Sequence, residues 1–288
     1  MRDAFRIGFA ACAVGFLGLN SCDTLDNPVI GIIEPCDETE VPEFTPLETD
    51  IQRILVEDFT AHQCGNCPPA AVKVAEYVEL HPNQIVPLAV HAGGLASTNE
   101  EYPTDWTCDE SEVFWEDLQF QVNPVGRINR LEDETSVLLL DEWDDAVDAL
   151  LDASPAAGLQ MVVDHDQASG NTGIHVHVSW FNDVLGPVRL ALLISENHLV
   201  GPQLWYSTVD PPGTGYMEEY EHEHMLRGSV TGAKGLVVAD NPLAGETQQE
   251  CYAFAWNNAW DASNSDLVAV LTAANGSVLQ TLSVPVSE

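Results

Sequence analysis

The sequence predicts an α/β domain over residues 48–153, followed by an all-β, immunoglobulin-like sandwich over residues 154–288. Three observations support this prediction. The chain has 288 residues, a length that suits two domains. Its first half alternates strand-like and helix-like segments, as parallel sheets do. Beyond Pro155 the pattern changes to short apolar or alternating runs separated by Gly, Asn and Asp, which is typical of antiparallel strands.

The first domain begins with a β-α-β unit. Residues 54–59 are an apolar run of strand length, and residues 68–80 have a helix-like pattern. A His-Pro-Asn break then leads into a second apolar run at residues 85–91. A strand, a helix and a strand in this order favour a parallel pair of strands.

The remainder of the first domain is predicted to contain a loop, two helices and a strand region between them. Residues 93–109 are polar and rich in turn formers, so we expect a loop over one edge of the sheet. Residues 110–121 place apolar side chains at helical spacing. Residues 141–152 carry Trp143 and Val147 on one stripe, which predicts a closing amphipathic helix.

The second domain is predicted from a series of short runs with strand character. A turn at residues 168–173, rich in Gly and Asn, predicts a hairpin. Residues 205–213 are interpreted as a long irregular connection of the kind that carries recognition or covers a sheet edge. The predicted strands are residues 159–164, 174–181, 188–194, 229–230, 236–238, 251–256, 267–271 and 278–284.

The N-terminus has the layout of a lipoprotein signal peptide, predicted over residues 1–21. Basic residues precede an apolar run at 7–19, which is too short for a comfortable transmembrane span. The sequence Leu-Asn-Ser-Cys at 19–22 resembles a lipobox, which makes Cys22 the predicted lipid anchor in the cell envelope, at the outer membrane. Without acylation the mature protein would be soluble. Residues 22–47, which mix prolines and acids, are predicted to form a tether.

The chain is strongly acidic, with 46 acidic against 9 basic residues and a formal net charge of −37. This charge argues against nucleic acid and anionic lipid head groups as partners. A solvated acidic surface suited to salty surroundings explains the charge more simply than specific calcium binding, because the sequence contains no complete EF-hand loop. No cofactor is predicted.

Five cysteines remain once Cys12 is removed with the signal peptide and Cys22 carries the lipid. One disulfide among these five leaves three thiols, so at most one further disulfide can form. At least one thiol then stays unpaired or bonds another chain, and the sequence does not choose among the pairings. The five are Cys36, Cys64, Cys67, Cys108 and Cys251.

The segment Cys64-Gly65-Asn66-Cys67 carries the predicted chemistry. It lies between the first strand and the first helix, so one thiol is expected on the exposed first helical turn. Free backbone N–H groups and the helix dipole favour a thiolate there. Such a thiolate attacks a disulfide, and the second cysteine resolves the mixed disulfide that forms. The alternatives are an inert short-range bridge or half of a metal site.

Residues 54–68 resemble the active-site strand and turn of thioredoxin-like proteins, and the elements that follow resemble that fold over roughly 100 residues. The resemblance implies that Cys64 is the attacking thiol and Cys67 the resolving thiol. It also implies that Asp58 is a buried carboxylate that accepts a proton on behalf of Cys67. A solvent-facing Asp58 near the strand end is the alternative.

The same resemblance implies that Pro124 is a cis-proline opposite the first cysteine, whereas an ordinary trans turn is the alternative. His62, if protonated, would stabilise the thiolate, although a solvated surface histidine explains it equally well. Gln63 and Gly65-Asn66 stand where thioredoxin has Trp and Gly-Pro. These departures weaken the predicted mechanism more than the predicted fold.

The whole chain resembles a family of envelope lipoproteins from Bacteroidetes-type bacteria, the outer-membrane proteins of about twenty-eight kilodaltons. Its name describes a location and carries little biochemistry, so it supports the architecture better than any reaction. The residues that carry the resemblance are Cys22, residues 56–60 leading into residues 64–68, Pro124-Val125-Gly126 with Asn129-Arg130, and residues 220–228.

Two pairs of histidines are a weaker candidate for a metal site. His175 and His177 alternate on a predicted strand and therefore share one face. His222 and His224 would do the same if their segment is extended. Outward-facing polar residues on half-exposed strands explain both pairs without a metal.

The leading hypothesis is a lipid-anchored envelope protein that exchanges thiols and disulfides with other envelope proteins. Its main alternative is a non-catalytic surface binding or adhesion lipoprotein in which Cys64 and Cys67 form a permanent bridge. A buried Cys64 would argue for abandoning catalysis in favour of that alternative. Metal carriage through the paired histidines is the third hypothesis.

Overall fold

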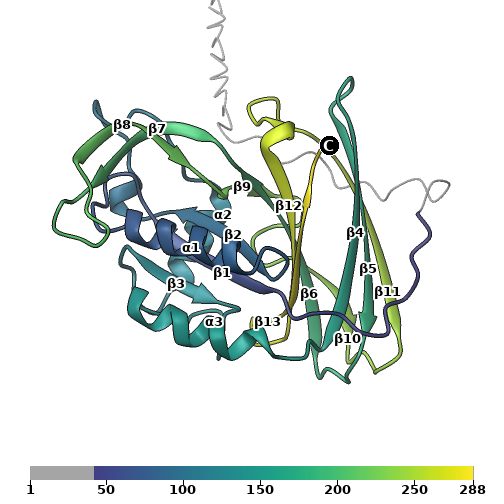
Figure 1. Ribbon diagram of the computed structural model, residues 1–288. Helices are drawn as coiled ribbons and strands as arrows, with labels where there is room; N and C mark the ends of the chain where they lie inside the picture. Colours follow the sequence, from purple (N-terminus) through teal and green to yellow (C-terminus); the bar gives the residue numbers. More distant parts are fainter. Residues whose placement is uncertain (1–41, 288) are drawn as a thin grey trace, which may run out of the picture.

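The computed structural model describes residues 42–287 (Figure 1). The predicted signal peptide at 1–21, the lipid anchor Cys22 and most of the tether at 22–47 lie outside the described residues. Within the described part of the chain, no helix combines the length and the apolar character needed to cross a bilayer. The elements are β1 (Ile54–Thr60), α1 (Pro68–Leu80), β2 (Ile85–His91), α2 (Asp109–Asp117), β3 (Val125–Ile128), α3 (Trp143–Leu151), β4 (Ala157–Asp166), β5 (Asn171–Trp180), β6 (Pro187–Glu196), β7 (Leu199–Trp205), β8 (Gly215–His222), β9 (Met225–Ser229), β10 (Leu236–Asp240), β11 (Thr247–Ala255), β12 (Ser265–Thr272) and β13 (Val278–Pro285).

Strands from both halves of the chain form one eight-stranded sheet. Its order is β13-β12-β6-β9-β2-β1-β3, and β10 pairs with β6. β1 runs parallel to β2 and antiparallel to β3, while β9 joins β2 to β6. The sheet therefore continues across residue 154, and Figure 1 shows the three helices gathered around its β1, β2 and β3 end.

The alternation of side chains along β1 builds a core on each face of the sheet. Ile54 and Val56 pack with α1 and α3 in a cluster that includes Trp143. Leu55 and Phe59 point to the other face, where they pack with α2 and with residues of β6 and β12. The two halves of the sequence therefore share a hydrophobic core as well as a sheet.

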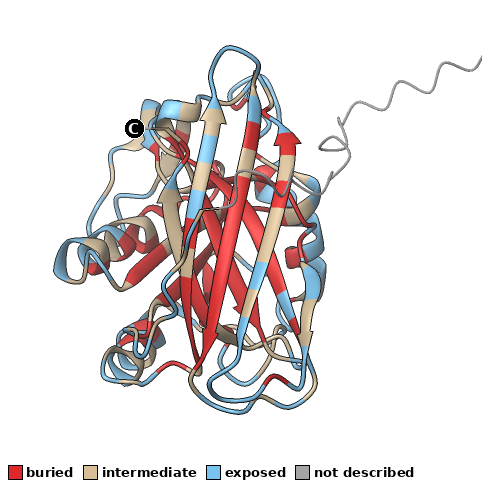
Figure 2. Ribbon diagram, turned by 90° about the vertical axis from the view of Figure 1, so that its right-hand side faces the viewer, coloured by how far each residue is buried: buried red, intermediate tan, exposed pale blue. Residues whose placement is uncertain are grey.

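The second half adds a three-stranded antiparallel sheet in the order β11-β5-β4. Its apolar side chains pack on β6, β12 and β13 of the main sheet. Alternation along β6 makes this possible, because Leu190 and Leu192 face the three-stranded sheet while Ala191 and Leu193 face the α2 side. Figure 2 shows buried residues along these long strands and exposed residues in the loops at their ends.

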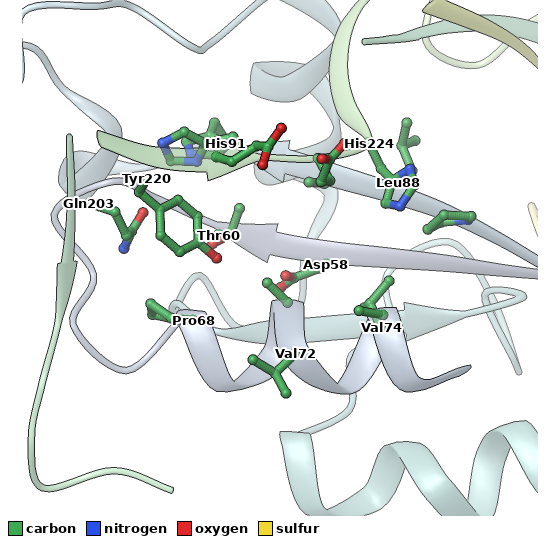
Figure 3. Close-up of a pocket in the computed structure, with 17 residues that line it drawn as sticks. Asp58, Thr60, Pro68, Val72, Val74, Leu88, His91, Gln203, Tyr220 and His224 are labelled. Carbon is green, nitrogen blue, oxygen red and sulfur yellow. The ribbon is translucent and has the colours of Figure 1, made fainter. Parts of the chain in front are cut away.

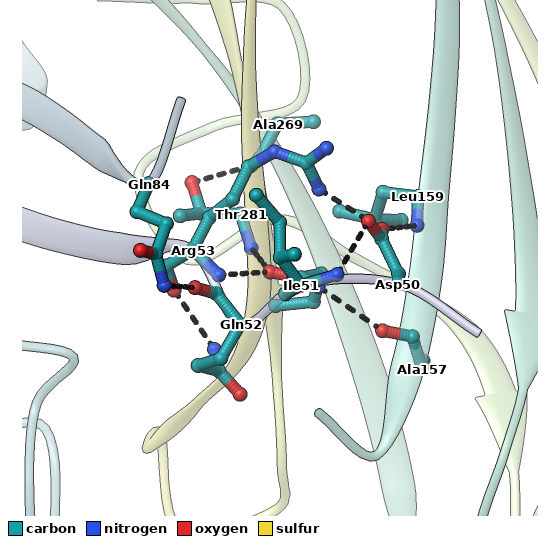
Figure 4. Close-up of polar contacts among 10 residues, drawn as sticks. Asp50, Ile51, Gln52, Arg53, Gln84, Ala157, Leu159, Ala269 and Thr281 are labelled. Carbon is teal, nitrogen blue, oxygen red and sulfur yellow. Dashed lines mark hydrogen bonds and ion pairs between the residues drawn. The ribbon is translucent and has the colours of Figure 1, made fainter. Parts of the chain in front are cut away.

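Hydrogen bonds connect the segment before β1 to the second half of the chain (Figure 4), and a buried glutamine on β13 makes two of them. The Gln280 amide donates to the carbonyl oxygens of Ile51 at 2.9 Å and of Ala157 at 3.3 Å. Its side-chain oxygen accepts from the backbone N–H of Arg53 at 3.0 Å, and Arg53 forms an ion pair with Asp50 at 2.9 Å. These contacts fix the start of β1.

The coarse prediction of a mixed α/β region followed by antiparallel strands is confirmed. The predicted helices at 110–121 and 141–152 correspond to α2 and α3. The hairpin of β7 and β8, which forms its own two-stranded sheet, was missed. Its strands flank residues 205–213, where the sequence analysis expected only an irregular connection.

Candidate functional site

A disulfide between Cys64 and Cys67 lies in the turn between β1 and α1. The backbone N–H of Cys67 donates to the carbonyl oxygen of Cys64 at 3.1 Å, and α1 begins directly after Cys67. Pro68 and Pro69 open the helix, where a missing N–H and a fixed φ are tolerated. The predicted order of strand, Cys-x-x-Cys turn and helix is confirmed.

The expected exposure of the Cys64 thiol is wrong for this structure. Cys64 is only 3% exposed and Cys67 only 1%. Exposure was predicted from the local strand, turn and helix alone. In the structure, two segments that follow later in the chain cover the turn. Both cysteines are therefore shielded from a second protein in this conformation.

The first covering segment is the end of β7, which pairs with the cysteine turn through its backbone. The N–H of Leu204 donates to the carbonyl oxygen of His62 at 2.9 Å. The N–H of Tyr206 donates to the carbonyl oxygen of Gly65, also at 2.9 Å. The segment thus lies along the turn as an added extended strand would.

Side chains of the same segment reinforce this contact. Gln203 is buried, and its amide donates to the carbonyl oxygen of Cys64 at 3.2 Å. The Tyr206 ring lies against Gly65 so closely that a Cβ at position 65 would be 2.6 Å from the ring. A glycine is therefore needed at position 65 for this close approach.

The second covering segment is the loop between β2 and α2, which was predicted as a loop over one edge of the sheet. Its residue Ala96 packs in one apolar cluster with the two cysteines. Its residue Tyr102 stacks on His62 with ring centroids 5.0 Å apart. The Tyr216 hydroxyl of β8 donates to the carbonyl oxygen of Glu101 at 3.1 Å, so this loop and the hairpin also contact each other.

His62 is buried under this loop, not solvated at the surface. One of its ring nitrogens lies 3.0 Å from the carbonyl oxygen of Ser97. Burial lowers the pKa of His62, although the Ser97 carbonyl and Asp105 oppose the shift. The structure therefore favours a neutral His62, which adds no positive charge beside Cys64.

Asp58 is the most unusual ionisable group near the disulfide. It is 3% exposed, and its Oδ1 atom has no hydrogen-bond partner among the described residues. Burial raises the pKa of Asp58 from 3.8 to about 8, so the carboxyl group is largely protonated at neutral pH. Figure 3 shows Asp58 pointing from β1 toward α1, into a cavity that is also lined by Pro68, the residue after Cys67.

Pro124 lies at the same end of β1 as the cysteine turn. The Asn123–Pro124 peptide bond is cis, as the resemblance implies. β3 begins at the next residue, where Val125 pairs with Phe59, and the Asn123 amide donates to the carbonyl oxygen of Thr60 at 3.2 Å. The structure thus brings Asp58, the two cysteines and Pro124 to one end of β1.

Glu57, next to Asp58, forms a buried ion-pair cluster that sequence analysis missed. Its carboxylate lies 2.8 Å from a guanidinium nitrogen of Arg127 and 2.8 Å from one of Arg130. Burial alone would raise the pKa of Glu57, but the two guanidinium groups hold it below its ordinary value. The signal was available, because a glutamate inside an apolar strand needs a cationic partner and two arginines follow Pro124 closely.

The two predicted histidine pairs lie in different parts of the fold. His175 and His177 are on β5 in the three-stranded sheet, and their neighbour Cys251 is disulfide-bonded. His222 ends β8 and His224 follows it. Across residues 42–287, one group of side chains is placed to reach a common metal ion, and it contains none of these four histidines. That group is His198, Glu221 and Glu223.

Two solved structures with a similar fold illustrate the comparison. HBP35 of Porphyromonas gingivalis has a TM-score of 0.62 at 15% identity, covering 83% of this chain and 76% of that chain. Protein AGR_C_4864 from Agrobacterium tumefaciens has a TM-score of 0.53 at 12% identity, covering 83% of this chain and 96% of that chain. At these identities the similarity shows a shared fold alone. No curated protein matches the chain.

Comparison with protein families gives a match to the outer membrane protein Omp28 over residues 114–288. The match begins within α2 and includes Pro124 and the β7–β8 hairpin, but it does not include the Cys64–Cys67 turn. It covers more than half of the 288 residues and confirms the family resemblance inferred from the sequence. The chain therefore belongs to the Omp28 family of outer membrane proteins.

Proposed function

We propose that this protein exchanges disulfides with thiols of other envelope proteins through Cys64 and Cys67, in a thioredoxin-like domain joined to a β-sandwich. In the oxidised form, a substrate thiolate attacks the Cys64 sulfur, and Cys67 leaves as a thiolate. A second substrate thiolate then displaces Cys64 from the mixed disulfide. Two electrons pass from the substrate to the cysteine pair, and the reverse sequence reduces a substrate disulfide.

The buried carboxyl group of Asp58 is the observation that carries this proposal. A permanent structural bridge has no need of an unpartnered acid on the strand that leads into it, and burying such a group lowers stability. A departing thiolate does need a proton donor. A carboxyl group with a pKa of about 8 is protonated at neutral pH and loses its proton readily enough to serve this purpose.

The exchange assay tests the cysteine roles. We expect the wild-type protein to catalyse reduction of insulin by dithiothreitol and the Cys64→Ser variant to lose this activity. Cys108→Ser is the matched control, because Cys108 is a free cysteine whose thiol is hindered by burial, which raises its pKa to about 12. This control should retain full activity. Equal, background rates for the wild type and Cys64→Ser would contradict the proposal.

The proposal also requires the end of β7 to leave the cysteine turn. We expect Tyr206→Ala to speed reduction of the Cys64–Cys67 disulfide by dithiothreitol about tenfold, because it weakens the contact that covers Gly65. Val200→Ala is the control, since Val200 lies on the same hairpin and its side chain is 60% exposed. Thiol titration over time measures both rates, and identical rates would show that the hairpin does not limit access.

Burial of both cysteines favours a second candidate, a non-catalytic surface binding protein with a structural Cys64–Cys67 bridge. This candidate predicts no insulin reduction by the wild type. It also predicts a disulfide that resists dithiothreitol until the protein unfolds globally, in both hairpin variants. The two assays together separate the candidates.

A further inference from the structure

A cavity of about 240 Å³ lies between α1, β2 and the β8 strand of the hairpin (Figure 3). Most of its wall is apolar. The first turns of α1 contribute Pro68, Val72 and Val74, and β2 contributes Pro87 and Leu88. Cavities with apolar walls and a few convergent polar groups are the usual form of a small-molecule site.

Four buried polar atoms of this wall lack hydrogen-bond partners within the described chain. These are Oδ1 of Asp58, both ring nitrogens of His91 and Nε2 of His222. Asp58 is 3% exposed, His91 2% and His222 5%. Buried polar atoms without partners are rare in folded proteins, and three such side chains around one cavity indicate a place for a polar group of a ligand.

The lining residues indicate whether that ligand carries a positive or a negative charge. Asp58 contributes a buried carboxyl group, and no lysine or arginine is among the lining residues. Glu221 and Glu223 also line the wall, but their carboxylates are partly exposed and contact His198. Burial lowers the pKa of His91 and of His222, which keeps both imidazoles neutral at pH 7. A cation therefore meets acceptor atoms at this wall, and none of the lining residues carries a positive charge.

We propose that this cavity binds a small organic cation with an apolar body, such as an alkylamine, whose ammonium group donates to Asp58. The apolar body lies along Val72 and Val74 of α1, and His91 accepts a second hydrogen bond. Charge-assisted hydrogen bonds of this kind are about twice as strong as neutral ones. Although the site shares Asp58 with the proposed exchange reaction, binding requires no reaction at the disulfide.

The test uses three six-carbon probes on the oxidised full chain, in which no thiol chemistry takes place. By isothermal titration calorimetry at pH 8, where about half of the Asp58 carboxyl groups are ionised, we expect n-hexylamine to bind about tenfold more tightly than n-hexanol. Hexanoate should bind more weakly than either. Equal affinities for the amine and the alcohol, stronger binding of hexanoate, or no binding of the amine would each overturn the proposal.

Two variants locate the site. Asp58→Asn should remove the preference for the amine over the alcohol, and Val72→Phe should weaken both by filling the cavity. Val113→Phe is the control for the second variant, because Val113 is an exposed residue on α2, outside the cavity. An amine preference that survives Asp58→Asn would overturn the assignment of the ammonium group to Asp58.

A pH series on the wild type gives the same information if Asp58→Asn does not fold. Amine affinity should rise as pH increases toward 8, because the ammonium group binds the ionised form of Asp58. The other titratable groups of the wall are His91 from β2, Tyr220, Glu221 and His222 from β8, and Glu223 and His224 from the turn that follows β8, while α1 contributes none. Because hexanol carries no charge, the pH dependence of its affinity measures the combined effect of these other groups. A ratio of amine affinity to alcohol affinity that does not change with pH would overturn the proposal.

Discussion

Replacing Glu57 with glutamine is expected to lower the free energy of unfolding by about 3–5 kcal/mol. Arg127 and Arg130 are 1% and 3% exposed, and the Glu57 carboxylate is the buried negative charge that contacts both. A neutral amide would leave two guanidinium charges buried without a counter-charge. Urea denaturation at pH 7, followed by circular dichroism, measures the loss.

An exposed ion-pair group provides the matched control. Lys234 contacts Asp117 at 2.9 Å and Glu134 at 3.2 Å, and its side chain is 45% exposed. Lys234→Gln should therefore cost less than about 1 kcal/mol. If both variants lost the same small amount of unfolding free energy, burial would not increase the contribution of the Glu57 cluster to stability.

The second large effect is a pH-dependent stabilisation by Asp58→Asn. The Asp58 carboxyl titrates at about 8 in the folded protein and near 3.8 when unfolded. Between these values the folded state holds a proton that the unfolded state releases, so rising pH favours unfolding. This group lowers the free energy of unfolding of the wild type by up to about 1.4 kcal/mol for each pH unit in that window, a dependence that asparagine lacks.

The measurement is the difference in unfolding free energy between Asp58→Asn and the wild type at about pH 5, 6, 7 and 8. We expect this difference to increase steadily in favour of the variant. Buried histidines titrate in both proteins, so their contribution cancels in the difference in unfolding free energy. Asp152→Asn, at the exposed end of α3, should give no such trend. A flat difference for Asp58→Asn would mean that the Asp58 carboxyl is not shielded from water.

The candidate site was predictable where its residues lie on neighbouring elements of a β-α-β unit. Asp58 is on β1, Cys64 and Cys67 follow β1 directly, and Pro124 precedes the strand that pairs with β1. The short-range pattern of strand, turn and helix placed the two cysteines, whereas the resemblance to thioredoxin-like proteins singled out Asp58 and Pro124. The coarse order of an α/β region and antiparallel strands followed from the same kind of pattern.

The covering hairpin was not predictable in the same way. Leu204 and Tyr206 contact the cysteine turn through backbone hydrogen bonds, and such contacts leave no signature in side-chain periodicity. Their partners are also far away in the sequence. One signal was present, since the alternation of acids with aromatic residues and histidines in residues 215–222 is typical of a strand. Exposure of Cys64 was therefore overestimated from local sequence alone.

The position of β9 between β2 and β6 has a consequence for how the protein is made. The backbone N–H of Ala89 on β2 donates to the carbonyl oxygen of His224, just before β9, at 2.7 Å. During translation, a nascent chain that ends at residue 153 has an uncovered β2 edge with unpaired backbone groups, a known template for aggregation. The uncovered β2 edge of the nascent chain is thus expected to need protection by chaperones until residues 225–229 have left the ribosome.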